Sequence, residues 1–165
     1  MSRHGYGRIK RLQAAALPLL LCLCMAAAAC HPYTRYDEYR HINAEGWDRD
    51  TVVCFDVAPA AESGTYTEDL LIRTDNRYPF RQLRLVVDQE IIPSHRTITD
   101  TLMFDIYSSD GDNEGRGFSL FHNEKVFRFL TLRQGDSLHV TVRHDMRRHI
   151  LSGIHDIGLL LEVRE

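Results

Sequence analysis

The chain has 165 residues, of which 44% are apolar and 26% charged, the profile of a globular protein and not of a disordered tail or a repeat array. This length fits a single domain. A formal charge of −3 is far from the strongly basic surface of a general nucleic-acid binder, so no nucleic-acid partner is expected.

The first 29 residues have the pattern of a secretory signal peptide. Residues 1–11 carry four basic side chains and no acidic one, and the largely apolar stretch 12–29 follows. Cys30 stands directly after three alanines, which favours a lipoprotein signal in which the Cys30 thiol receives a diacylglyceryl group and Cys30 becomes the mature N-terminus. Two alternatives stay open: a plain cleaved signal, and an uncleaved anchor at the lower length limit for spanning a bilayer.

Cleavage before Cys30 changes the composition of the mature chain. It leaves 136 residues and removes four basic residues and no acidic one, so the formal charge falls from −3 to −7. Cys22 and Cys24 leave with the leader and Cys30 is lipidated, so Cys54 has no disulfide partner. Stability is therefore expected to come from a packed core, and membrane attachment from more than one acyl chain at Cys30.

Residues 30–50 are polar and aromatic and are interpreted as a lipidated tether that docks onto the body. Tyr33, Tyr36 and Tyr39 are three residues apart, so they either line one side of a helical turn or cover an edge of the core. Trp47, the single tryptophan, is expected to fill one end of the core.

Residues 51–165 show short alternating runs that predict strands, with Val53, Phe55 and Val57 facing inward in the first. The predicted strands are 51–57, 66–74, 82–90, 97–106, 118–121, 126–132, 137–144 and 157–163, and only 144–153 looks helical or irregular. About eight strands without a βαβ crossover predict an all-β domain, a single β-sandwich with jelly-roll connections.

Residues with catalytic or metal-binding potential do not form a recognisable site. His144 and His149 are five residues apart, so they would not share a helix face as zinc-protease histidines do. Asp110–Gly115 begins like a calcium loop, but its twelfth position is Phe121, where a bidentate Glu is required. Ser119 lacks the glycine context of a nucleophile elbow. No catalytic residue, metal or cofactor is predicted, and the chain is not expected to be an enzyme.

Four segments follow one another along the mature chain and carry a family resemblance. They are Tyr36-Asp-Glu-Tyr39 with Gly46-Trp47 and Phe55-Asp-Val57; Arg73-Thr-Asp-Asn-Arg-Tyr78-Pro79-Phe80-x-x-Leu83; Gly115-x-Gly117-Phe118-Ser119-Leu120-Phe121; and His144-Asp-Met146-Arg147 with Leu151-x-Gly153-Ile154-x-Asp156-Ile157-Gly158. With the lipidation signal at Cys30, they resemble the gliding-motility lipoprotein H (GldH) family. The resemblance implies a non-enzymatic, lipid-anchored accessory protein of the cell envelope, associated with the gliding and type IX secretion apparatus. No acidic run follows Cys30, which favours the periplasmic side of the outer membrane.

The segment from Met146 to Ile157 is polar, irregular and flanked by strands, which is where binding surfaces tend to lie. Arg147, Arg148 and Asp156 are therefore candidates for contact with an envelope protein partner. A salt-bridged connection between two strands is an equally good interpretation of this segment.

Two other functions compete with the interaction module. A carbohydrate-binding jelly-roll lipoprotein needs exposed aromatic side chains, and Trp47, Tyr66, Tyr78 and Tyr107 are the available supply. A buried Trp47 would count against it. A hydrolase with a dispersed site would need a cleft holding two carboxylates or a His–Asp pair with a shifted pKa.

Overall fold

The computed structural model describes residues 34–164, so the leader, Cys30 and Tyr33 lie outside the described part. Its strands are β1 (Thr34–His41), β2 (Trp47–Asp48), β3 (Val53–Val57), β4 (Gly64–Thr74), β5 (Gln82–Ile92), β6 (Arg96–Asp105), β7 (Arg116–Gly117), β8 (Phe121–Leu132), β9 (Ser137–His144), β10 (Ile150–Leu151) and β11 (Ile154–Val163). In this range the structure contains no helix long and apolar enough to cross a membrane.

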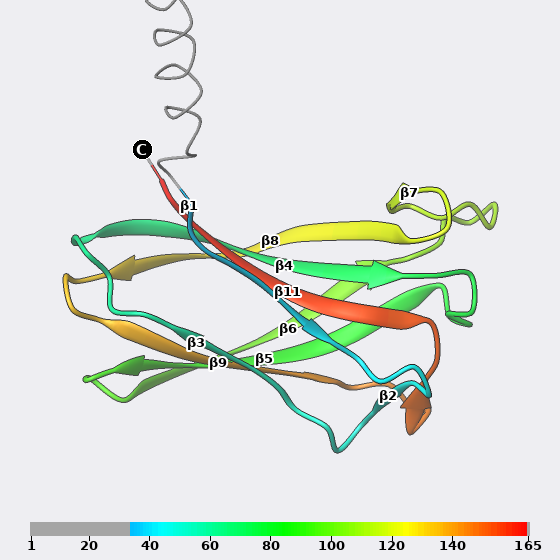
Figure 1. The fold of residues 1–165 in the computed structure, drawn as a ribbon, viewed down its shortest axis with the longest axis horizontal. Helices are drawn as coiled ribbons and strands as arrows, with labels where there is room; N and C mark the ends of the chain where they lie inside the picture. The colour runs from blue at the N-terminus through cyan, green and yellow to red at the C-terminus, as the bar shows by residue number, and fades with distance from the viewer. Residues whose placement is uncertain (1–33, 165) are drawn as a thin grey trace, which may run out of the picture. The chain divides into compact units, whose positions relative to one another are not determined.

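The strands form two antiparallel sheets that face each other (Figure 1). Sheet 1 has the order β1-β11-β4-β8-β7, and sheet 2 has the order β3-β9-β5-β6, with the short pair β10-β2 beside them. Eight strands have five residues or more. If these eight are numbered 1 to 8 in chain order, their spatial order is 1-8-3-6 in sheet 1 and 2-7-4-5 in sheet 2. This is the strand order of a jelly roll, so the predicted β-sandwich is confirmed.

The alternating strand pattern produces the core. In β3, Val53, Phe55 and Val57 are buried while the residues between them are exposed, as predicted. The strands β4, β5, β9 and β11 contribute most of the remaining core, including Leu70, Ile72, Leu83, Leu85, Val87, Val140, Val142, Ile157 and Leu159. Burying one such face from each sheet is what holds a sandwich together.

Trp47 lies at one end of this core and is only 1% exposed. Its indole Nε1 donates to the carbonyl of Thr51 at 2.9 Å, and the ring of His144 packs edge-on against it, with centroids 5.3 Å apart. The prediction that Trp47 fills one end of the core is therefore confirmed.

Residues 34–41 of the expected tether form β1, which pairs with β11 along its whole length. The helical-turn alternative for the tyrosines is therefore wrong for the two that are described. Tyr36 points inward and meets Phe55 edge-on, whereas Tyr39 lies on the outer face over Gly158. A Cβ at Gly158 would come within 2.7 Å of the Tyr39 ring, so this glycine leaves the space that the ring occupies.

The prediction of two strands at 118–121 and 126–132 was wrong in its boundaries. Residues 121–132 form one continuous strand, β8, and 118–120 form the turn of a hairpin between β7 and β8. The sequence around Asn123 and Lys125 looks like a break because it is polar, but both side chains have partners within the fold: Asn123 is buried and donates to the Thr74 hydroxyl at 3.5 Å, and Lys125 donates to the Met103 carbonyl.

Polar contacts join the two sheets near the edge formed by β6 and β8. The guanidinium of Arg128 in β8 binds Asp100 in β6 through two bonds of 2.6 and 2.7 Å. Deeper inside, the amide of Gln89 donates to Glu68 at 3.0 Å, and both residues are fully buried. Burial raises the pKa of Glu68 to about 7, although the Gln89 hydrogen bond and the charge of Arg128 act in the opposite direction.

The sandwich has two different ends. At the end where β1 begins and β11 finishes, which we call the anchor end, the connections are the short turns 58–63, 93–95 and 133–136. At the opposite end, which we call the distal end, lie the segments 42–52, 75–81, 106–120 and 145–153. The longer irregular segments are therefore gathered at the distal end.

Candidate interaction surface at the distal end

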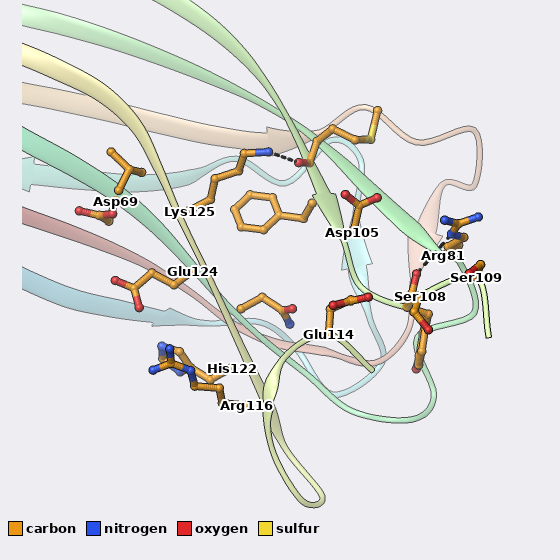
Figure 2. Close-up of a pocket in the computed structure, with 15 residues that line it drawn as sticks. Asp69, Arg81, Asp105, Ser108, Ser109, Glu114, Arg116, His122, Glu124 and Lys125 are labelled. Atoms are coloured by element: carbon orange, nitrogen blue, oxygen red, sulfur yellow. Dashed lines mark hydrogen bonds between the residues drawn. The ribbon is translucent and has the colours of Figure 1, made fainter. Parts of the chain in front are cut away.

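A groove of about 910 Å³ lies between the edge strands β6 and β8, toward the distal end (Figure 2). Lys125 crosses it and donates from Nζ to the backbone carbonyl of Met103 at 2.6 Å. Acidic and basic side chains are mixed on its walls, including Asp69, Asp105, Glu114, Glu124, Arg81, Arg116 and His122. The mixture gives the groove no single charge that would select an ionic ligand.

The carboxyl of Asp69 is the groove member with a clearly shifted pKa. Burial, followed by the charges of Glu124 and Glu162, raises the pKa of Asp69 to about 6. The residue is only 4% exposed, so a substrate has little access to it. A raised pKa beside a second carboxylate, that of Glu124, meets part of the condition stated above for a hydrolase.

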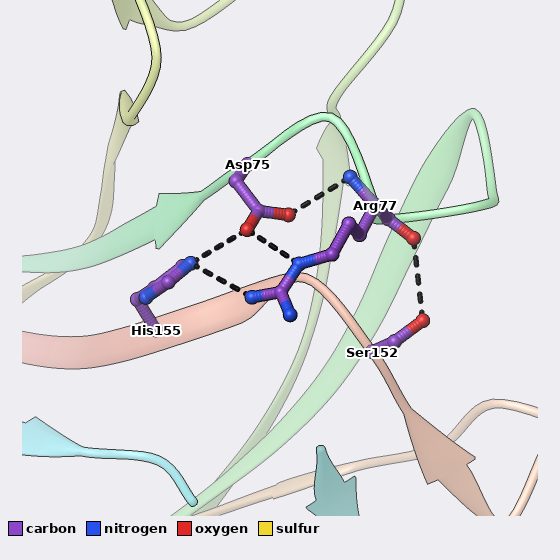
Figure 3. Close-up of polar contacts among 4 residues, drawn as sticks. All are labelled: Asp75, Arg77, Ser152 and His155. Carbon is purple, nitrogen blue, oxygen red and sulfur yellow. Dashed lines mark hydrogen bonds and ion pairs between the residues drawn. The ribbon is translucent and has the colours of Figure 1, made fainter. Parts of the chain in front are cut away.

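A second polar cluster joins two loops of the distal end (Figure 3). Asp75 accepts hydrogen bonds from Arg77 Nε and faces His155 Nε2, both at 2.8 Å. Burial opposes ionisation of Asp75, but the bonds from His155 and Arg77 outweigh it and lower the pKa of this carboxyl below its ordinary value. Ser152 donates to the Arg77 carbonyl at 3.2 Å and not to the histidine, so the group is not a Ser-His-Asp triad.

The neighbouring backbone explains why this cluster is rigid. Gly153 has a φ of +78°, and a Cβ there would come within 2.2 Å of the Tyr78 nitrogen. The turn at 75–78 and the turn at 152–153 are thus in direct backbone contact, and the ion pair of Asp75 fixes one on the other. We interpret the cluster as structural.

A shallow apolar hollow lies at the distal end of the outer face of sheet 2. Its floor is made by Phe80, Met103 and Met146, and its volume is about 280 Å³. Three charged side chains lie at its rim: Arg84 and Asp145, which form an ion pair at 2.9 Å, and Arg147. We call this feature the Met hollow. Methionine side chains are flexible and polarisable, and they suit surfaces that adapt to a partner.

The predicted contact residues fall on two surfaces. Arg147 and Arg148 are exposed in the segment between β9 and β10, and neither forms an ion pair with any residue in 34–164. Asp156 lies instead in β11, on the outer face of sheet 1. Its carboxylate is 3.2 Å from His41 and 3.6 Å from Arg73, so its charge is already compensated within the sheet. The structure therefore does not place Asp156 beside the two arginines.

The hairpin between β7 and β8 was missed as a surface feature because 118–121 was expected to be a strand. Phe118 at its tip is 96% exposed, and Leu120 is 40% exposed. Gly117 has a φ of +147°, and a Cβ there would come within 2.0 Å of the Leu120 carbonyl, so only glycine allows this turn. The two glycines at 115 and 117 were the signal in the sequence that indicated a turn.

His144 and His149, whose spacing does not fit a zinc-protease helix, lie apart in the structure. His144 is buried, with Nε2 3.2 Å from the carbonyl of Trp47, whereas His149 is at the surface, 3.4 Å from Asp48. One ligand atom each of Asp48, Asp50 and His149 lies within 4.8 Å of the others. Two of the three are exposed, and such groups are common at protein surfaces without a metal ion.

The aromatic side chains available to a carbohydrate site are mostly inside the protein. Trp47 and Tyr66 are 1% exposed and Tyr78 is 2% exposed, and Tyr107 is half-buried. The exposed aromatic platform that the carbohydrate-binding alternative needs is therefore not supplied by these residues.

Comparison with known proteins gives a family match over most of the chain. The family model described as GldH lipoprotein matches residues 34–161. The gliding motility lipoprotein GldH of Flavobacterium johnsoniae is 27% identical over 154 residues, which cover 89% of this chain and 96% of that protein. A GldH homolog of Christiangramia forsetii is 26% identical and covers 82% and 87%, respectively.

Solved structures show only distant likeness. A CocE/NonD family hydrolase from Staphylococcus aureus has a TM-score of 0.42 at 10% identity, covering 81% of this chain and 34% of that one. The Eiger TNF of S. frugiperda has a TM-score of 0.33 at 14% identity, covering 81% and 94%. At scores this low the likeness carries no argument about function.

Proposed function

We propose, since the chain belongs to the GldH lipoprotein family, that it is a lipid-anchored, non-enzymatic accessory module of the gliding and type IX secretion apparatus. The observation that supports this most directly is the two-ended fold, in which short turns gather at the end that follows the lipidation site. The irregular loops gather at the other end. We place the protein on the outer membrane, facing the periplasm.

The proposed anchor lies very close to the sandwich in the chain. Residues 30–33 separate the Cys30 thiol from β1, and four fully extended residues span at most about 14 Å. The anchor end must therefore stay near the membrane surface. Strand β4 has eleven residues and runs from the anchor end to the distal end, so the distal loops lie roughly 35 Å farther out.

The distal end therefore faces away from the membrane and is available to an envelope protein partner. Arg147 and Arg148 project there without an ion pair in the described chain, beside the Met hollow. Unpaired charges at the rim of an apolar hollow can select a partner by electrostatic complementarity. We assign these two arginines to partner contact, and we assign Asp156 to holding β1, β4 and β11 together.

The proposal is tested by crosslinking and affinity capture from intact cells, scored by mass spectrometry. The wild-type protein should recover motility or type IX secretion components, and the Arg147→Glu/Arg148→Glu variant should lose them. The matched control is Arg96→Glu/Arg133→Glu, which reverses two exposed arginines at the anchor end. Equal capture by both variants, or recovery of glycan-uptake proteins by the wild type, would contradict the assignment.

The anchor is tested separately by Cys30→Ala. This variant should lose incorporation of labelled fatty acid, because the thiol that carries the lipid is missing. If the wild type incorporates no more labelled fatty acid than Cys30→Ala, the lipoprotein assignment is wrong.

A further inference from the structure

Phe118 is displayed to solvent at the tip of a short hairpin. Its side chain is 96% exposed, and the backbone that presents it is fixed by the pairing of Arg116 with His122 and of Gly117 with Phe121. Aromatic side chains, Phe among them, are enriched at the core of protein interfaces relative to the rest of the surface. The hairpin therefore has the form of a preorganised anchor for an apolar pocket.

The Met hollow is an apolar recess on the same chain. Its floor of Phe80, Met103 and Met146 lies on the outer face of sheet 2, whereas the hairpin extends the edge of sheet 1. Phe118 is nearly fully exposed, so it does not occupy the hollow of its own chain. The two features are free to meet only between molecules.

The charges beside the two features have opposite signs. The loop that leads into the hairpin carries Asp110, Asp112 and Glu114, and Arg116 lies in the hairpin itself, so three acidic residues and one basic residue give 110–118 a formal charge of −2. At the hollow, Arg84 is paired with Asp145, whereas Arg147, and Arg148 next in the chain, keep their positive charges. The two features therefore carry opposite net charges, and complementary charges steer such surfaces together.

We propose that Phe118 of one copy inserts into the Met hollow of a second copy, joining the proteins head to tail. This contact uses Arg147, which is also assigned above to the envelope partner, so the two contacts alternate at one surface. Both features lie at the distal end, and thus at a similar height above the membrane. Copies anchored in one leaflet can therefore engage side by side without inverting. This last step rests on the proposed lipid anchor. A contact between two unlike patches is heterologous, so it extends into rows unless it closes into a ring.

The contact is small, and we expect it to be weak in free solution. Confinement to a membrane raises the effective concentration of one patch beside the other, as linkage does for multivalent binders. The test therefore uses the full-length lipoprotein, purified from membranes and placed in phosphatidylcholine vesicles. Cys54 is exposed, so it can carry a donor or an acceptor dye.

Energy transfer between labelled wild-type copies should exceed that of randomly distributed molecules and rise with surface density. Phe118→Ser should weaken association about tenfold or more, the loss of at least about 1.4 kcal/mol that truncating a central aromatic anchor brings. Phe129→Ser is the matched control, because Phe129 is also exposed, at 56%, but lies toward the anchor end. It should leave the transfer unchanged.

The hollow is tested by Met146→Asp and, since Met146 is partly buried, also by the rim variant Arg147→Glu. Each should associate as poorly as Phe118→Ser. A mixture of Phe118→Ser and Arg147→Glu should regain transfer, because one supplies an intact hollow and the other an intact hairpin. Each molecule in this mixture keeps only one working patch, so the mixture forms pairs and not rows. Its energy transfer should therefore reach a plateau at low surface density.

Two results would overturn the proposal. One is wild-type transfer equal to that of Phe118→Ser at every density, and the other is a mixture that stays at background. If Phe118→Ser stops gliding in cells while wild-type copies do not associate, the hairpin binds a different protein. Failure of the protein to remain on vesicles would instead contradict the anchor, so the two proposals fail in distinguishable ways.

Discussion

Glu68 is a buried carboxyl whose protonation should make the stability of the folded protein depend on pH. Its carboxyl lies between the sheets, beside Gln89 and near Arg128, Asp100 and Asp69. One oxygen of Glu68 and the carbonyl oxygen of Gln89 have no hydrogen-bond partner. The folded state therefore favours the protonated acid, which can donate where the carboxylate cannot.

The raised pKa of Glu68 predicts that stability falls as the pH rises. The stabilising effect of the protonated form is complete below the ordinary pKa of 4.5 and is lost as the pH passes through about 7. The loss should be about 3 kcal/mol, the equivalent of this pKa difference. Glu68→Gln keeps a neutral polar group, so it should be more stable than the wild type at pH 8, with the difference shrinking toward pH 5.

Urea unfolding followed by the fluorescence of Trp47 measures these free energies at the two pH values. Glu45→Gln is the control, because Glu45 is exposed and should show the same small effect at both. A difference for Glu68→Gln that does not depend on pH would mean that the carboxyl is not held protonated.

Gly153 and Gly135 form a natural pair for separating backbone strain from steric overlap. Both have a left-handed φ, +78° and +89°, but only a Cβ at Gly153 would meet backbone, whereas Gly135 has open space around it. Gly135→Ala should cost about 1–2 kcal/mol of unfolding free energy, the price of the left-handed conformation. Gly153→Ala should cost about 3 kcal/mol or more. Equal losses in a urea titration would show that the turn at 75–78 can move away.

At the scale of elements, β6 and β8 form the edge at which the two sheets are open to solvent. The bidentate pair of Arg128 with Asp100 and the bond from Lys125 to the Met103 carbonyl are the side-chain contacts that join them. Edge strands with inward-pointing charges resist pairing with other chains. The same residues therefore hold the sheets together and protect their edges.

Arg128→Met should loosen this edge. It keeps the aliphatic packing but leaves Asp100 unpaired and removes the positive charge nearest Glu68, so a loss of about 1–3 kcal/mol is expected. Amide hydrogen exchange should accelerate in β6 more than in β9. The matched control is Arg143→Met, whose ion pair with Asp88 lies within sheet 2 and is more exposed, at 44% and 33%. It should cost less than about 1 kcal/mol. Uniform acceleration across both sheets would contradict a local effect.

The fold was predictable where burial alternates strictly. Val53, Phe55 and Val57 reveal a strand because one face is in the core and the other in water. The strand β1 was not predictable in this way, since it is an edge strand whose residues are mostly polar or half-buried. The site was harder still. Its features depend on how segments far apart in the chain are paired, which no local pattern contains. Examples are the exposure of Phe118, the ion pair of Asp156 with Arg73, and the hollow that Phe80 and Met146 line together.

At the scale of the whole molecule, the separation of the two ends predicts how the protein sits on a membrane. Gln134 lies in an anchor-end turn and Asp112 in a distal loop, and both are exposed. In a Cys54→Ser background, a dye on Gln134→Cys should be quenched by a headgroup quencher in vesicles, and a dye on Asp112→Cys should not. Residues 30–33 allow about 14 Å between Cys30 and the start of β1 at the anchor end, whereas the length of β4 places the distal loops roughly 35 Å from that end.

Detergent-solubilised protein is the control for this measurement, since both dyes should then respond equally. Quenching of Asp112→Cys as strong as that of Gln134→Cys in vesicles would mean that the sandwich lies flat on the membrane. The distal surface would then not be free for a partner in the way proposed.

Thr34 pairs with Glu162, so the first described strand begins beside the end of the last one. A fluorescent protein or affinity tag fused beyond β11 would therefore emerge into the narrow space between the sandwich and the lipid, where it would crowd the anchor. Reporter insertions are better made near Gly111, a loop tip with no atom within 4 Å of where a Cβ would stand. Because β1 begins beside the end of β11, a circular permutant opened at this loop would need only a short linker to join Thr34 to Val163.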